Sequence, residues 1–110
     1  MPVAPSPRFL DQVDAEYRWR EREHGPESAD RWYAAVDAAL EELAGALFPD
    51  GYALCREADD LGEPLRQLMF GVGRTRRPSH RLIFRVTPAA LEVLAVRDLR
   101  QRDLTPRDLR

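Results

Sequence analysis

The sequence predicts an α+β domain in which an antiparallel helical hairpin packs on one face of a small antiparallel β-sheet. Two segments with helical spacing of apolar residues occupy the first half of the chain. Three short apolar runs, separated by turn-rich gaps, occupy the second half and indicate consecutive strands. Short links make neighbouring strands antiparallel. Because two helices cannot bury both apolar stripes against each other alone, the sheet must cover the remainder.

The first helix is expected to begin at Ser6-Pro7, with serine as the N-cap and proline at the first helical position. It should run to about Glu23 and stop before Gly25-Pro26. Its apolar stripe consists of Phe9, Leu10, Val13 and Tyr17. Any strand in residues 2–5 should be short and lie at a sheet edge, because its prolines cannot donate to a ladder.

The second helix is expected to open at Pro26 and to end at Phe48-Pro49-Asp50-Gly51. Its stripe steps by three and four residues through Ala29, Trp32, Val36, Leu40, Leu43 and Leu47. Aromatic residues on amphipathic helices usually belong to the core or to the helix–helix interface. This interpretation is favoured over base stacking for Trp19, Trp32 and Tyr33.

The strands are expected at about 64–70, 80–87 and 91–97, after an irregular acidic connection over residues 51–63. Alternation along the middle strand places Leu82, Phe84 and Val86 against the helices. The same alternation places Arg81, Ile83 and Arg85 on the other face, which we expect to be open to solvent. Residues 1–97 then form one domain, and 98–110 form a charged tail that is loose or orders as a short helix on a partner.

Charge is distributed unevenly along the chain. Residues 1–55 hold five arginines against eleven acidic residues, a net charge of −6, whereas residues 56–110 hold twelve arginines against eight, a net charge of +4. Six of these arginines fall between positions 66 and 85. The split favours an anionic or acidic partner for one face, although charges that only solvate a small domain give the same pattern.

Other features limit the function classes. The lone cysteine, Cys55, can form no internal disulfide and belongs to no cluster of metal-ligand residues, so neither metal nor cofactor is expected. No run of about 18 apolar residues indicates a membrane span. The N-terminus lacks the pattern of a signal peptide, so we expect a cytoplasmic protein.

The order of elements resembles the RelE/ParE-type toxins of bacterial type II toxin–antitoxin modules. The segments that carry the resemblance are Asp14–Trp19, Ala29–Tyr33, Leu65–Leu68, His80–Val86 and Val93–Arg97. The resemblance implies a helical hairpin on a twisted antiparallel sheet. It also implies a cognate antitoxin whose C-terminal segment wraps the toxin and silences it. Whether the free toxin forms a homodimer is left open.

The family divides by chemistry, since RelE-like members cut messenger RNA on the ribosome whereas ParE-like members inhibit DNA gyrase and are not nucleases. Cleavage needs a base, an acid and a cation for the developing charge. The residues available for a metal-independent endoribonuclease are Arg81, Arg97, His80 and Asp98. Arg81 matches the arginine of nucleolytic relatives, but no Tyr or His follows His80 where those relatives usually carry their acid. The site therefore looks incomplete.

We accordingly favour a toxin that is bound by an antitoxin, inhibits growth through a protein target such as gyrase, and is not an enzyme. An endoribonuclease acting on the ribosome, and a decayed member without toxicity, are the alternatives. The candidate residues for binding antitoxin or target are Arg66, Arg74, Arg76, Arg77, Arg81, Arg85, Arg97 and Arg100. Replacing Arg81 and Arg85 with alanine is expected to weaken binding or toxicity and to leave the fold intact.

Overall fold

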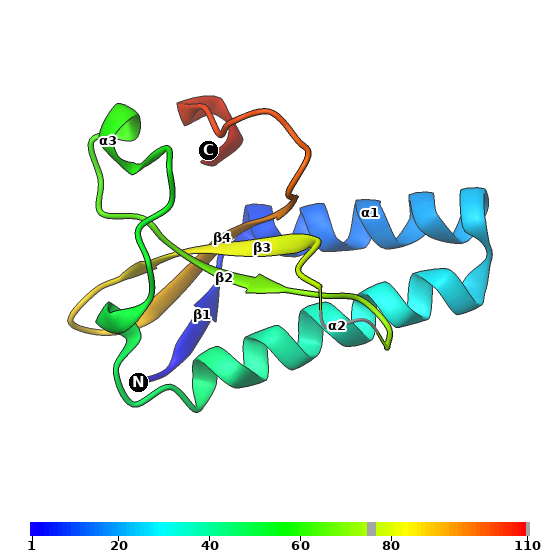
Figure 1. The fold of residues 1–110 in the computed structure, drawn as a ribbon, viewed down its shortest axis with the longest axis horizontal. Coiled ribbons are helices and arrows are strands. Elements are labelled where there is room, and N and C mark those ends of the chain that lie inside the picture. Colours follow the sequence, from blue (N-terminus) through cyan, green and yellow to red (C-terminus); the bar gives the residue numbers. More distant parts are fainter. Residues whose placement is uncertain (75–76, 110) are drawn as a thin grey trace.

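Two long helices and a four-stranded sheet make up the fold in a computed structural model, which describes residues 1–74 and 77–109 (Figure 1). The helices are α1 (Pro7–His24) and α2 (Pro26–Ala44). The strands are β1 (Val3–Pro5), β2 (Arg66–Phe70), β3 (His80–Val86) and β4 (Leu91–Asp98). The sheet order is β1-β4-β3-β2, and the predicted α+β class is confirmed.

The helical hairpin starts and turns where the sequence predicts. The Ser6 hydroxyl accepts a hydrogen bond from the backbone N–H of Phe9 at 3.1 Å, as an N-cap does. Gly25 separates the helices with a φ of +90°, a conformation that glycine adopts without strain. Helix α2 ends at Ala44, earlier than expected, and Leu47 is 86% exposed. The prediction that Leu47 belongs to the buried stripe is therefore wrong, because Gly45 ends the helix first.

The first core cluster lies between the hairpin and one face of the sheet. Trp32 of α2 is 1% exposed and packs in this cluster with Leu82 and Phe84 of β3, as the alternation predicts. Of the other two helix aromatics, Trp19 is 44% exposed and does not follow the prediction, whereas Tyr33, although 50% exposed, lies at the helix–helix interface as predicted. Trp19 makes an edge-on contact with the ring of His24, and Tyr33 one with Tyr17.

Strand β1 is a short edge strand, as expected, but it pairs in parallel with β4 and so makes the sheet mixed. The pairing covers only Leu91 to Val93 of β4. Farther along, the side chain of Gln12 in α1 replaces the missing strand. Its amide nitrogen donates to the carbonyl of Val96 at 2.6 Å, and its oxygen accepts from the Val96 N–H at 3.0 Å. A single side chain thus satisfies both polar groups of a buried backbone position.

We expect Gln12→Leu to destabilise the protein by about 2 kcal/mol, because it leaves the Val96 N–H and C=O without partners. Urea unfolding measures this change, and Asp11→Ala on the exposed side of the same helical turn is the matched control. A loss no larger for Gln12→Leu than for the control would show that water replaces the amide at no cost.

The second face of the sheet is covered, which the sequence analysis did not anticipate. The short helix α3 (Ala58–Leu61) and the 3₁₀ turn η2 (Pro106–Leu109) pack there around a second core cluster that includes Cys55, Ile83 and Leu104. Figure 1 shows α3 and the C-terminal segment next to each other, on the opposite side of the sheet from α2. The face expected to be open is therefore an interior layer, and the tail folds against the domain.

A β-bulge in β4 decides which side chains face this second layer. Ile83 is opposite Ala95 and Phe84 is opposite Val93, so Leu94 is an extra residue between them. After the bulge the alternation is reversed. Arg97 consequently lies on the same face as its neighbour across the strands, Arg81, under α3 and the tail.

Candidate functional site

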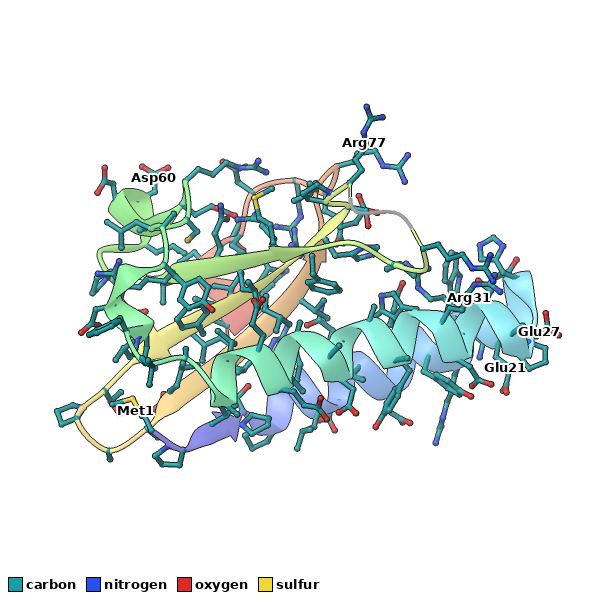
Figure 2. All side chains as sticks on the ribbon, turned by 60° about the horizontal axis from the view of Figure 1, so that its bottom comes forward. Met1, Glu21, Glu27, Arg31, Asp60 and Arg77 are labelled. Carbon is teal, nitrogen blue, oxygen red and sulfur yellow. The ribbon has the colours of Figure 1, made fainter. Side chains whose placement is uncertain are left out.

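The predicted arginine surface separates into buried, half-buried and exposed members. Arg81 and Arg97 are 2% and 7% exposed. Arg66 and Arg85 are half-buried, and Arg74, Arg77 and Arg100 are exposed. Figure 2 shows Arg77 at the outer rim of the molecule. Arg76 lies outside the described residues.

Arg81 forms a buried ion pair, so its predicted place on an open face is wrong. Its two terminal nitrogens donate to the two carboxylate oxygens of Glu57 at 2.8 and 2.5 Å, and one of them also donates to Gln67. Glu57 accepts a third hydrogen bond from the backbone N–H of Leu104 in the tail. Burial acts to raise the pKa of Glu57, but these hydrogen bonds outweigh it and lower the pKa to about 2. The pair connects β3, the α3 segment and the tail.

The half-buried arginines also have partners within the chain. The guanidinium of Arg85 bridges two carboxylates, with nitrogen–oxygen distances of 2.9 Å to Glu63 and 3.0 Å to Glu92. Arg66 donates to the backbone carbonyl of Tyr52 at 2.6 Å. These contacts bring residues 52–63 onto the sheet. The arginines that suggest a binding surface in the sequence therefore hold residues 52–63 against the sheet.

Three of the four catalytic candidates line one cavity of about 460 Å³. His80 and Asp98 reach it from the ends of β3 and β4. Arg97 also lines it, but its guanidinium turns to the tail on the other face of the sheet, and Arg81 does not line it. The opposite wall consists of helix residues that the sequence analysis did not single out as site residues, chiefly Glu16, Arg20 and Trp32. Their only sequence signal is the i, i+4 spacing of Glu16 and Arg20 on one helix face.

His80 is buried, and both nitrogens of its ring have hydrogen-bond partners. Nδ1 lies 2.8 Å from the Ser79 hydroxyl, and Nε2 lies 3.4 Å from a terminal nitrogen of Arg20. The ring also stacks on Phe70. Burial lowers the pKa of His80, and the positive charge of Arg20 acts in the same direction while Asp98 opposes it. The imidazole is therefore neutral at pH 7 and accepts at Nε2 from Arg20.

The imidazole of His80 should titrate with a midpoint below its ordinary value of 6.5. Because the folded pKa is depressed, its contribution to stability is present above pH 6.5 and is lost as pH falls through the folded pKa. NMR titration of the ring resonances measures the midpoint, and His80→Asn should remove this part of the pH dependence of unfolding. A midpoint at or above 6.5 would contradict the buried, neutral assignment.

Arg97 lacks the carboxylate that Arg81 has. A terminal nitrogen donates to the carbonyl of Arg102 at 2.5 Å, and Nε has no hydrogen-bond partner among residues 1–74 and 77–109. No ion pair to Arg97 is found within these ranges. Burial accordingly lowers the pKa of the guanidinium.

The cavity is poorly arranged for proton transfer. Burial acts to raise the pKa of Asp98, but hydrogen bonds from the backbone and side chain of Arg100 lower it, so the carboxylate is ionised at neutral pH. The accepting nitrogen of His80 faces a guanidinium. An arginine stays protonated and is neither a base nor a good acid. Among the three candidates His80, Arg97 and Asp98, no group combines an available proton with access to a substrate.

The described residues contain no group of three or more His, Cys, Asp or Glu side chains placed to hold a metal ion. Within the same residues, no helix is long and apolar enough to span a membrane.

The comparisons with known proteins agree with this fold. A family model described as the ParE toxin of the type II toxin–antitoxin system, parDE, matches residues 3–103. Among solved structures, the chain is similar to one titled "Chromosomal ParDE TA system from P. aeruginosa", with a TM-score of 0.67 and 18% identity over 89% of this chain and 95% of that one. No curated protein matches the chain. Since the family model spans nearly the whole sequence, this chain belongs to the ParE toxin family of type II toxin–antitoxin systems.

Proposed function

We propose that this toxin acts by binding proteins and not by cutting RNA: a cognate antitoxin silences it, and the released toxin inhibits a cytoplasmic protein target such as DNA gyrase. The observation that carries the proposal is that none of the candidates His80, Arg97 and Asp98 is placed to donate a proton to a substrate. Membership of the ParE family supports the antitoxin as partner.

The exposed arginines are the part of the predicted interface that a partner can reach without opening the fold. Arg74 and Arg77 lie in the loop between β2 and β3, and Arg100 follows β4. Two acidic residues of the hairpin, Glu21 and Glu27, lie at its far end (Figure 2). The molecule thus presents cationic loops at one place and an acidic hairpin end at another, which orients an acidic partner toward the loops.

The test uses the toxin released from its complex with the antitoxin. Purified gyrase should lose its supercoiling activity when the toxin is added and regain it when the antitoxin is added. Primer extension on messages from growth-arrested cells should show uncut transcripts. Intact supercoiling together with transcripts cut at defined sites would reject the proposal.

The second candidate is a ribosome-dependent endoribonuclease, which is favoured by the meeting of His80 and Asp98 in one cavity. It requires the ribosome to move Arg20 away from His80 Nε2, so that the imidazole can serve as a base. His80→Asn would then abolish transcript cleavage. Induction without growth arrest, in a host lacking the antitoxin, would instead indicate a decayed toxin.

A further inference from the structure

The two helices leave a groove between them on a face of the hairpin that the sheet does not cover. Two adjoining hollows make up this hairpin groove, one of about 380 Å³ and one of about 50 Å³. The hollows share Leu10, Val13 and Tyr33, and all of the described residues that line them belong to α1 or α2. The hairpin groove is therefore a surface of the helices alone.

Large apolar side chains line the hairpin groove and remain accessible. Leu10 belongs to the stripe that the sequence analysis expects to be buried, yet it is 54% exposed, and Tyr33 across the groove is 50% exposed. Val36 forms part of the floor at 2% exposed, and Leu40 is half-buried. Neighbouring exposed apolar side chains over a hollow are typical of a surface that another molecule covers.

The charges along the hairpin groove all have the same sign. Its described lining residues include three carboxylates and no arginine or histidine; the carboxylates are those of Asp14, Asp30 and Asp37. Asp14 pairs with Arg18 at 3.4 Å, but both side chains are mostly exposed, so the pair screens little of the charge. Neither Asp30 nor Asp37 has an ion pair within residues 1–74 and 77–109. The apolar floor is thus bordered by uncompensated negative charge.

The larger hollow combines these carboxylates with two aromatic rings. Tyr17 and Tyr33 meet edge to face, with ring centroids 5.8 Å apart. The Tyr17 hydroxyl donates to Asp30 at 2.6 Å, which fixes the carboxylate beside the rings. Aromatic faces and carboxylates both attract a cation. A lysine or arginine side chain entering this hollow would find both kinds of group together.

The backbone around the hairpin groove favours a helical occupant. The peptide groups of α1 and α2 along the groove are paired within their own helices, so an extended strand would find no ladder partners there. A helix satisfies its own backbone and needs only side-chain contacts. The seven-residue step from Leu10 to Tyr17 spans about 10 Å, which corresponds to about two turns of an opposing helix.

We propose that the hairpin groove docks a basic amphipathic α-helix of a partner protein. Its apolar side chains would cover Leu10 and Tyr33, and its lysine or arginine side chains would lie against the three aspartates. The proposal goes beyond the proposed function, in which an acidic partner meets the cationic loops. It gives the protein a second docking surface of opposite charge.

The probe is a synthetic peptide of about 14 residues with leucine on one helical face and lysine on the other. A peptide with glutamate in place of each lysine is its control. We expect the full chain to bind the lysine peptide saturably, with NMR shifts concentrated at Leu10 and Tyr33, and to weaken severalfold between about 50 and about 300 mM salt. The glutamate peptide should not bind.

Two pairs of variants locate the contact. Tyr33→Ala should weaken binding of the lysine peptide at least about fivefold, whereas Phe48→Ala, at a side chain 80% exposed outside the groove, should leave it unchanged. Asp37→Asn should weaken it about threefold, and Glu42→Gln on another exposed side of α2 is the matched control. Circular dichroism checks that each variant is folded.

Several results would overturn the proposal. Equal binding of the two peptides would remove the role of charge, and equal losses for Asp37→Asn and Glu42→Gln would mean general attraction to an acidic protein. No saturable binding of the lysine peptide would remove the docking site itself. A chain that dimerises by sedimentation, with the dimer lost in Tyr33→Ala, would assign the hairpin groove to a second copy. Each of these results leaves the proposed function standing, because gyrase inhibition is measured without the peptide.

Discussion

Arg81→Met is expected to lower the free energy of unfolding by about 3–5 kcal/mol. The substitution removes both donors to a Glu57 carboxylate that is 1% exposed and leaves a buried negative charge without its partner. The free energy of unfolding of a typical domain is about 5–15 kcal/mol, so the variant loses a large part of its stability. Urea unfolding at pH 7, followed by circular dichroism, measures the change.

Two further variants separate the charge effect from loss of packing. Arg85→Met removes a half-buried guanidinium from half-buried carboxylates and should cost under about 1 kcal/mol. Replacing both partners, Arg81→Met with Glu57→Leu, should recover most of the loss, because no uncompensated charge remains. A double variant as unstable as Arg81→Met alone would show that the pair acts through geometry and not through charge.

The same pair makes a prediction about acid. The folded pKa of Glu57 is about 2, below its ordinary value of 4.5. A depressed carboxylate pKa contributes stability that is complete above pH 4.5 and is lost as pH falls toward 2, about 3 kcal/mol in all. Comparing acid unfolding of the wild type with Glu57→Gln tests this, since the variant should show a shallower decline in that window.

The sequence predicts the elements well because their signals are local. Ser6 followed by Pro7 fixes the start of α1, and Gly25 fixes the turn of the hairpin. Alternation correctly assigns Leu82 and Phe84 to the helix-facing core. Each of these inferences needs only a few consecutive residues. That is why the family resemblance, which depends on the order of such elements, is confirmed.

The covering of the second face could not be predicted, because it depends on contacts between distant segments. Glu57 lies in a stretch that has no long apolar pattern, and only its pairing with Arg81, 24 residues away, shows what it does. In the tail, Leu104 is isolated among charged residues, yet it is 4% exposed. An arginine on a strand predicts a charged face. Whether that arginine is exposed to solvent or forms a buried ion pair depends on which segments fold over the face.

The bulge in β4 is a second non-local effect. Strict alternation from Leu91 and Val93 would place Arg97 on the helix side of the sheet. The extra residue Leu94 reverses the pattern and brings Arg97 beneath the tail, beside Arg81. One inserted residue therefore creates the pair of buried arginines beneath the tail. Nothing in the composition of β4 distinguishes this register from the regular one.

Ending the chain after Arg100 is expected to destabilise it by roughly 4 kcal/mol or more. The deletion removes the buried Leu104 side chain, worth about 2–5 kcal/mol as Leu→Ala. It also removes the Leu104 N–H that donates to Glu57 at 2.9 Å, worth a further 1–3 kcal/mol or so. Thermal and urea unfolding of the shortened chain measure the sum. A loss of this size would mean that residues 98–110 are part of the folded domain and not a tail separate from residues 1–97.

A chain that ends after Leu104 is the matched control, since it loses six residues but keeps both contacts with the second layer. It should lose only about 1–2 kcal/mol, mainly the packing of Leu109 and the hydrogen bonds between Arg102 and Asp108. Leu104→Ala in the full chain should fall between the two, and it remains measurable if the shorter chain does not fold. Equal stability of both truncations with the wild type would mean that the tail covers the sheet without stabilising it, and Arg81 would then be reachable by a partner after all.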